Sequence, residues 1–192
     1  MKHKNPYYFN IDPDNTYFTS DTHFFHTKII EYAKRPFESV EEMNEVLVSN
    51  WNEVVSNDTL IFHLGDFAFG GKDNWESIRN RLNGKIHLLL GNHDLQNHRG
   101  ASQCNFESVS DLKHVNVLGD EPRLLILQHY PLLEWPLKDK IWHIHGHTHD
   151  SPFRENPIRS ITQYDIGVDN NNYKPVSYRE LVKIMNTKIT NG

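Results

Sequence analysis

The chain has a single cysteine, Cys104, among 192 residues. A lone cysteine cannot form an intrachain disulfide, and it cannot build a cysteine-rich zinc site. Nothing around it in the sequence indicates a lowered thiol pKa, so a cysteine nucleophile is not expected either. Any metal in this protein is therefore expected to be held by oxygen and imidazole ligands.

Long apolar runs are also missing. No stretch approaches the roughly 18 continuous apolar residues that a membrane-spanning helix needs, and residues 1–6 lack the apolar core of a secretory signal. Hydrophobic residues make up 37% of the chain and charged residues 23%, which is typical of a globular protein. We expect one domain over residues 1–192, located in the cytoplasm and without a membrane partner.

The chain has no excess of positive charge. It contains 20 basic and 25 acidic residues, which gives a formal net charge of −5. Proteins that bind nucleic-acid backbones by charge carry a basic surface instead. Nucleic acid is therefore a possible partner but not a favoured one.

Histidine is unusually frequent for its type, with 13 copies. Five of them lie in short motifs that contain other polar residues able to bind metals. In chain order the motifs are Asp21-Thr22-His23, Gly65-Asp66, Gly91-Asn92-His93-Asp94, His129 and Gly146-His147-Thr148-His149. Each motif alone is common by chance. Together they supply the carboxylates, amide and imidazoles that a site for two divalent metals needs.

Short apolar and β-prone runs lead into these motifs, as expected of strands that end in loops. Strands that alternate with helices indicate an α/β fold, in which ligands gather at the carboxyl ends of strands. The runs cover residues 17–20, 59–64, 86–90, 124–127 and 141–144, with a further candidate at 163–168. Residues 95–112 are polar and poorly periodic, and no element is predicted there.

Capping patterns mark the predicted helices. Ser39 and Glu42 form a capping box that opens a helix over residues 40–55, and Ser177 opens a second box before a C-terminal helix. Asp73 is placed to cap another helix, which Gly84 would end. A brief helix around residues 29–33 is expected to stop before the proline at position 36.

The ordered set of motifs resembles the calcineurin-like metallophosphoesterase superfamily. Its signature is Asp-x-His, Gly-Asp, Gly-Asn-His-Asp/Glu, His and Gly-His-x-His, and every part is present in that order between residues 21 and 149. The resemblance implies a four-layer αββα sandwich, an α/β fold with two mixed sheets flanked by helices. It also implies a metal-dependent phosphoric ester hydrolase with two divalent ions. The candidate ions are Mn, Fe, Zn and Ni, since such ligands accept several ions. Manganese is favoured among them.

The resemblance implies two groups of metal ligands. The first group would hold one ion and comprises Asp21, His23 and His149. The second group would hold the other ion and comprises Asn92, His129 and His147. A carboxylate has two oxygens with which to bridge two ions, and the resemblance gives that role to Asp66.

The resemblance further implies phosphate ester hydrolysis by attack of a metal-bridging hydroxide. His93 would protonate the leaving oxygen or stabilise charge on it, and Asp94 would orient or charge-stabilise His93. A short chain leaves little room for a cap domain, so an open site and a small phosphorylated substrate are expected, with phosphodiesterase activity favoured. The alternatives are a phosphomonoesterase, a nuclease acting on short nucleic acid, and a non-catalytic metal-binding scaffold. The sequence leaves the oligomeric state open.

Several further residues have both a functional and a structural interpretation. His26 could bind substrate phosphate near a helix start, or it could be an ordinary helix-start histidine. His98 and Arg99 could contact a phosphate, although a solvated loop is the simpler interpretation. Asp169 and the asparagines after it could shape the pocket or only form a turn. Structural histidines, hydrogen-bonded within buried strands, are expected at positions His63, His87 and His143.

Overall fold

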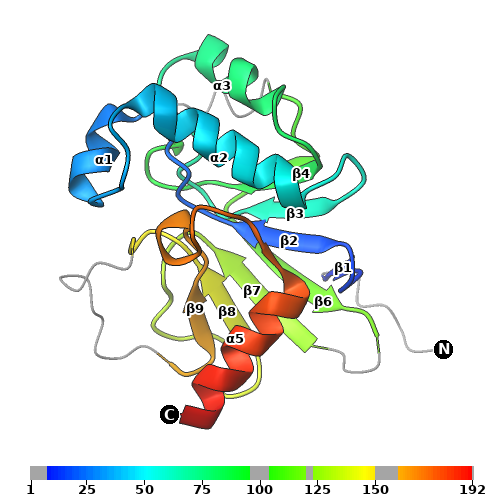
Figure 1. Cartoon of the computed structure of the whole chain (residues 1–192). Coiled ribbons are helices and arrows are strands. Elements are labelled where there is room, and N and C mark those ends of the chain that lie inside the picture. Colours follow the sequence, from blue (N-terminus) through cyan, green and yellow to red (C-terminus); the bar gives the residue numbers. More distant parts are fainter. Residues whose placement is uncertain (1–7, 96–103, 120–122, 150–159, 192) are drawn as a thin grey trace.

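The computed structural model describes residues 8–95, 104–119, 123–149 and 160–191. Its strands form two five-stranded sheets that lie one against the other (Figure 1). In spatial order the first sheet contains β10 (Val176–Ser177), β2 (Thr16–Thr19), β3 (Leu60–His63), β4 (Lys85–Leu89) and β5 (Ser108–Ser110). The second contains β1 (Phe9–Ile11), β6 (Leu112–Val117), β7 (Arg123–Gln128), β8 (Trp142–His145) and β9 (Gln163–Asp165).

Both sheets are mixed. In the first, β2, β3, β4 and β5 are mutually parallel and only β10 is antiparallel to its neighbour. In the second, β7, β8 and β9 are parallel, while β6 runs antiparallel to β7. Parallel neighbours bring their carboxyl ends to one edge of a sheet. The first sheet therefore presents four consecutive strand ends, and the second three, on which a site can be built.

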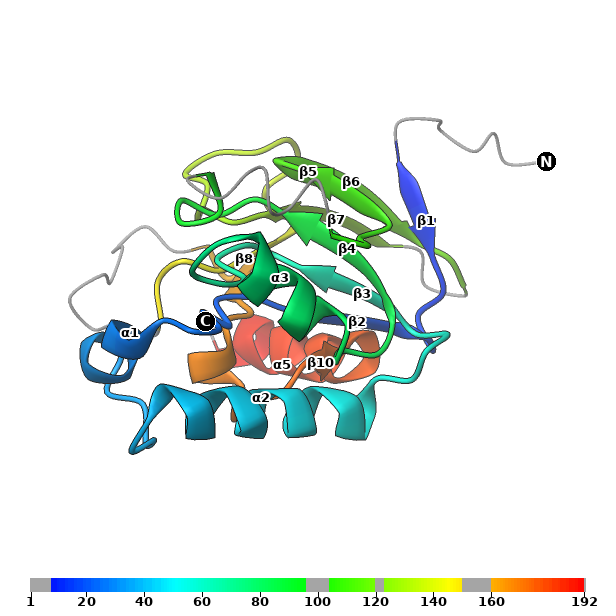
Figure 2. The ribbon, with the colours of Figure 1, turned by 90° about the horizontal axis from the view of Figure 1, so that it is seen from above.

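Helices α1 (Thr27–Tyr32), α2 (Val40–Val54) and α3 (Lys72–Arg79) lie on the side of the first sheet away from the second (Figures 1 and 2). Helix α2 begins as predicted, because the Ser39 side chain accepts a hydrogen bond from the Glu42 N–H at 3.1 Å. Its buried face, which includes Met43 and Leu47, packs with Ile61 of β3 in one hydrophobic core. No helix of the described ranges is both long and apolar enough to cross a membrane.

A second core lies between the two sheets. Phe18 and Phe62 of the first sheet point into this core, where their rings stack with centroids 5.6 Å apart. Leu125 of β7 belongs to the same core. Helix α5 (Tyr178–Asn191) contributes Leu181 and Met185 to the same cluster. The predicted α/β sandwich of two mixed sheets with flanking helices is confirmed.

Several local predictions are wrong. The segment over residues 95–112, predicted to have no element, contains β5, and strands β1, β6 and β10 were not predicted. These strands are short or rich in polar residues, and they form because neighbouring strands satisfy their backbone hydrogen bonds. Helix α3 begins after Gly71, without a side-chain cap, so Asp73 is not its cap. The run over residues 163–168 is a strand only to Asp165, and the 3-10 helix η3 (Val168–Asn170) follows.

We predict that Leu47→Ala will lower the free energy of unfolding by about 2–5 kcal/mol, since it leaves a cavity between α2 and the first sheet. Leu47 is 2% exposed in that core. Urea denaturation followed by circular dichroism measures the change. Ser49→Ala, on the exposed side of the same helix, should change it by less than about 0.5 kcal/mol. Equal stability of Leu47→Ala and the parent protein would contradict the packing described.

Candidate metal centre

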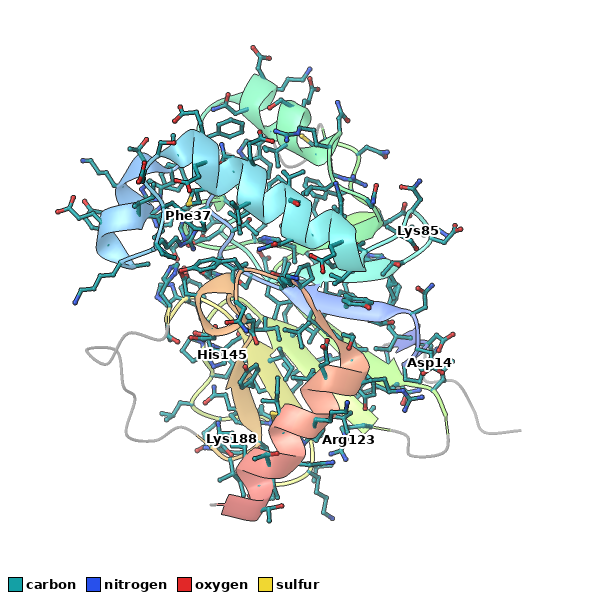
Figure 3. The ribbon with its side chains drawn as sticks, in the orientation of Figure 1. Asp14, Phe37, Lys85, Arg123, His145 and Lys188 are labelled. Carbon is teal, nitrogen blue, oxygen red and sulfur yellow. The ribbon has the colours of Figure 1, made fainter. Side chains whose placement is uncertain are left out.

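The structure brings the predicted metal ligands together at the carboxyl ends of strands from both sheets. The strand-end loops hydrogen-bond to one another: the Asp21 N–H donates to the Gly65 carbonyl at 2.9 Å, and the Gly146 N–H donates to the His129 carbonyl at 3.0 Å. The residues brought together are Asp21, His23, Asp66, Asn92, His129, His147 and His149. His145, labelled in Figure 3, ends β8 just before the last of these loops.

Asp21, His23 and His149 form the first group. One ligand atom from each lies within 4.8 Å of the others. The Asp21 Oδ1 atom is 3.6 Å from His149 Nε2 and 4.0 Å from His23 Nε2. A carboxylate and two imidazoles in this arrangement can hold one divalent ion.

His129 and His147 belong to the second group, and their ligand atoms and one from Asp66 lie within 4.8 Å of one another. The His129 Nδ1–H donates to the Leu64 carbonyl at 2.8 Å, which leaves Nε2 as the nitrogen with a lone pair. That Nε2 lies 3.1 Å from the Asn92 Oδ1 atom. Two acceptor atoms this close repel each other, and a cation bound to both would relieve the repulsion.

Asp66 lies between the two groups. Its Oδ2 atom is 3.4 Å from His23 Nε2 and 3.6 Å from His129 Nε2, so the same oxygen faces an imidazole of each group. Its other oxygen accepts the His93 backbone N–H at 2.9 Å, which fixes the rotation of the carboxylate. Asp66 therefore lies where a carboxylate could be shared by both groups.

Five of the candidate ligands have a left-handed backbone. Their φ angles run from 49° to 72°, in a region that costs residues other than glycine about 1–3 kcal/mol each; they are Asp21, His23, Asp66, His147 and His149. Close packing holds these turns. A Cβ atom on Gly91 would collide with Asp66, and one on Gly146 would collide with Ser20 and Asp21. Strain concentrated at the ligands is typical of a functional site.

The electrostatics of the buried side chains fit divalent cations. Burial, together with the carboxylates of Asp21 and Asp94, raises the pKa of Asp66 to about 8. Burial lowers the pKa of His23 and of His129, so both imidazoles are neutral near pH 7. The buried His23 Nε2 atom has no hydrogen-bond partner among the described residues. Closely spaced carboxylates and unprotonated imidazoles are a suitable donor set for two divalent ions.

His93 and Asp94 have different surroundings. His93 Nε2 is 3.9 Å from Asp66 Oδ2, and its side chain is 36% exposed, so its ring is accessible to solvent beside Asp66. The buried Asp94 carboxylate accepts the N–H groups of Asp66 at 2.7 Å and of Phe67 and Gly91 at 2.9 Å. Asp94 thus ties the second motif to the third. Its orientation of His93 stays a prediction.

His26 lies at the edge of the centre. Its ring stacks on Phe69, with centroids 3.7 Å apart, and its Nδ1 atom is 3.2 Å from His23 Nδ1. Burial and the nearby His93 lower the pKa of His26 to about 4, so it is uncharged near neutral pH. A neutral His26 can offer a substrate hydrogen bonding or stacking but not a positive charge.

The other sequence candidates separate clearly. The three expected structural histidines are buried and hydrogen-bonded: His63 to Thr22 at 2.9 Å, His87 to Ser108 at 2.6 Å, and His143 to the Ile126 carbonyl at 3.1 Å. Burial also raises the pKa of the Cys104 thiol, in agreement with an inert cysteine. His98 and Arg99 lie outside the described residues.

Sequence analysis missed Arg35 beside the first group and left Asp169 open between a pocket residue and a turn residue. Arg35 is buried and pairs with Asp169, whose Oδ2 atom lies 2.7 Å from His149 Nδ1. Asp169 follows the last predicted strand, and its position at a strand's carboxyl side was a usable signal. Arg35 gave no signal, because it lies in no motif and contacts Asp169 across 134 positions of sequence.

Comparison with known proteins gives the family. The family model for calcineurin-like phosphoesterases matches residues 15–185. The chain belongs to this family. A relative in Methanocaldococcus jannaschii, named uncharacterized protein MJ1445, is 34% identical over 174 residues, which cover 88% of this chain and 90% of that protein. The gene 66 protein of Mycobacterium phage L5 is 32% identical over 185 residues, with 81% and 86% covered.

A solved structure shares the family fold. The crystal structure of AQ665 from Aquifex aeolicus, described as a protein of unknown function, superposes with a TM-score of 0.66 at 26% sequence identity. The match covers 88% of this chain and 98% of that one. The buried His and Asp groups agree with the family assignment, because the family consists of metal-dependent phosphoesterases.

We predict that Asp66→Asn will reduce bound metal, because an amide cannot supply the charge of a shared carboxylate. Elemental analysis after equilibration with Mn²⁺ and removal of free ion measures the occupancy. Asp58→Asn is the control, since that side chain is 93% exposed. Unchanged metal content in Asp66→Asn would exclude Asp66 as a ligand.

Metal binding should release a proton from Asp66. With a pKa of about 8, the carboxyl is mostly protonated at pH 7 and must ionise to bind a cation. The apparent affinity should therefore rise up to about tenfold per pH unit below pH 8 and level off above it. Calorimetry in buffers of different ionisation enthalpy measures the protons released. No release at pH 7 would contradict the raised pKa.

Proposed function

We propose that this chain is a metal-dependent phosphodiesterase that acts on small phosphodiesters. The single observation that carries the proposal is the shared position of Asp66 between two ligand groups, beside the partly exposed ring of His93. Two metals about 3.5–4 Å apart suit the hydrolysis of phosphate esters. Family membership supports the same class of reaction.

Each chain residue has a defined task in this proposal. When bound, two divalent ions would supply Lewis acidity that activates water and neutralises phosphate oxygens. Asp66 would help to hold both ions, since one of its oxygens faces an imidazole of each group. The His93 ring, 3.9 Å from Asp66 and reachable by solvent, would give a proton to the leaving oxygen.

The engagement of Arg35, a buried arginine beside the ligand groups, supports a diester over a monoester. A phosphomonoester near neutral pH has about one more negative charge than a diester and gains from a further cationic side chain. Arg35 is close to the ligands, but its guanidinium is taken up by Asp169 and by the carbonyls of Asp21 and Thr22. It is therefore not available to bind a substrate phosphate.

We predict that the Mn²⁺-loaded protein will hydrolyse bis(p-nitrophenyl) phosphate faster than p-nitrophenyl phosphate. Release of p-nitrophenol measures both rates under the same conditions, and Asp66→Asn provides the metal-poor control. Activity on the monoester alone would replace the diesterase proposal with a phosphomonoesterase. Bound metal without hydrolysis of either compound would favour a non-catalytic scaffold.

We predict that His93→Ala will keep its bound metal and lose turnover by roughly 10²–10⁴-fold, the usual contribution of a general acid. Metal content and kcat are measured on the same preparation. The loss should be smaller for a substrate whose leaving group needs no proton. Full activity with a poor leaving group would exclude His93 as the proton donor.

A further inference from the structure

Arg35 makes several hydrogen bonds next to the candidate metal centre. Its side chain is fully buried. The guanidinium binds both oxygens of Asp169, with Nε 2.8 Å from Oδ1 and Nη2 2.9 Å from Oδ2. It also donates to the carbonyls of Asp21 at 2.7 Å and Thr22 at 3.0 Å. These carbonyls belong to the first motif, where Asp21 and His23 have left-handed backbone angles.

Asp169 continues this chain of contacts to a candidate ligand. Its Oδ2 atom accepts from His149 Nδ1 at 2.7 Å. Because the Nδ1–H is used in this bond, the lone pair is placed on Nε2, the nitrogen 3.6 Å from Asp21 Oδ1. The loop carrying Asp169 is itself fixed, since the Val168 N–H donates to the Ser20 carbonyl at 3.1 Å.

We propose that Arg35 and Asp169 are positioning residues for the first ligand group, and that they set the affinity of one metal ion but not of the other. Asp169 fixes the tautomer and rotation of His149. Arg35 holds the Asp169 carboxylate and, with the same guanidinium, the strained turn that carries Asp21 and His23. The candidate ligands that these two side chains contact directly, Asp21 and His149, both belong to the first group.

A purely structural ion pair is the competing explanation. Buried ion pairs contribute little net stability, because the cost of removing both charges from water offsets their attraction. The two explanations differ in what they predict for metal binding. A structural pair would affect both ions through general loosening of the fold, whereas a positioning pair would affect one ion.

This inference rests on the proposed function only in requiring two bound metals, so the test uses Mn²⁺ alone and no substrate. Calorimetric titration of the parent protein should show two equivalents. Asp169→Asn, which keeps the shape but loses the charge, should bind one ion normally and the other about 10–100-fold more weakly. Arg35→Lys should weaken the same ion, because lysine cannot hold the Asp169 carboxylate at two points. The weakening should be smaller than in Asp169→Asn, because lysine keeps the positive charge.

Arg79→Gln is the matched control. Arg79 is a partly buried arginine that, like Arg35, donates to backbone carbonyls. Its acceptors are Leu82, Gly84 and Asn105, and none of these belongs to a ligand group. It should lower thermal stability and leave both Mn²⁺ affinities unchanged. Circular dichroism verifies that each variant is folded; if Asp169→Asn is not, Arg35→Lys carries the test.

A double variant identifies which ion is weakened. His129→Ala removes a ligand of the second group, so it should keep only the first ion. Asp169→Asn with His129→Ala should then bind neither ion at a concentration where each single variant holds one. If the double variant keeps the ion that His129→Ala keeps, Asp169 does not serve the first group.

Other outcomes are equally decisive. Equal weakening of both ions, no weakening, or the same loss in Arg79→Gln would overturn the positioning role and leave the proposed function intact. A parent protein that binds no Mn²⁺ at all would instead contradict the proposed function itself.

Discussion

The carboxylate of Asp66 is the constraint on which the site depends. One oxygen faces imidazoles from two ligand groups, at 3.4 Å and 3.6 Å, while the other is fixed by the backbone of the third motif. Without a cation the ionised form of Asp66 is disfavoured, because burial and two neighbouring carboxylates raise the pKa of Asp66 to about 8. Divalent ions held by the two ligand groups would neutralise this crowded charge.

The fold supports this arrangement by packing directly beside it. Of the two hydrophobic cores, one under helices α1–α3 and one between the sheets, the first includes Phe24 and Phe67, which follow His23 and Asp66 in the chain. The two cores hold the strands rigidly enough for the loops at the strand ends to keep left-handed turns at five ligand positions. Gly91 and Gly146 allow these loops to approach within contact of Asp66 and Asp21. Strain at the site is thus balanced by the packing around it.

The sequence predicted much of this structure where local patterns were strong. The capping box at Ser39 and the apolar face of α2 appear as expected, as do the central strands that lead into the motifs. Strands β1, β5, β6 and β10 were missed because partners distant in sequence stabilise them. Arg35 was missed for a related reason: its partner Asp169 is 134 positions away, and no local pattern links the two. Asp66, by contrast, lies in one of the ordered motifs, and the family resemblance implied its role.

The most direct measurement of the central claim is anomalous diffraction from crystals grown with Mn²⁺. The account predicts two anomalous peaks about 3.5–4 Å apart, both within bonding distance of the Asp66 carboxylate. One peak should lie with Asp21, His23 and His149, and the other with Asn92, His129 and His147. A single peak that Asp66 does not touch, or no peak among these residues, would contradict the account.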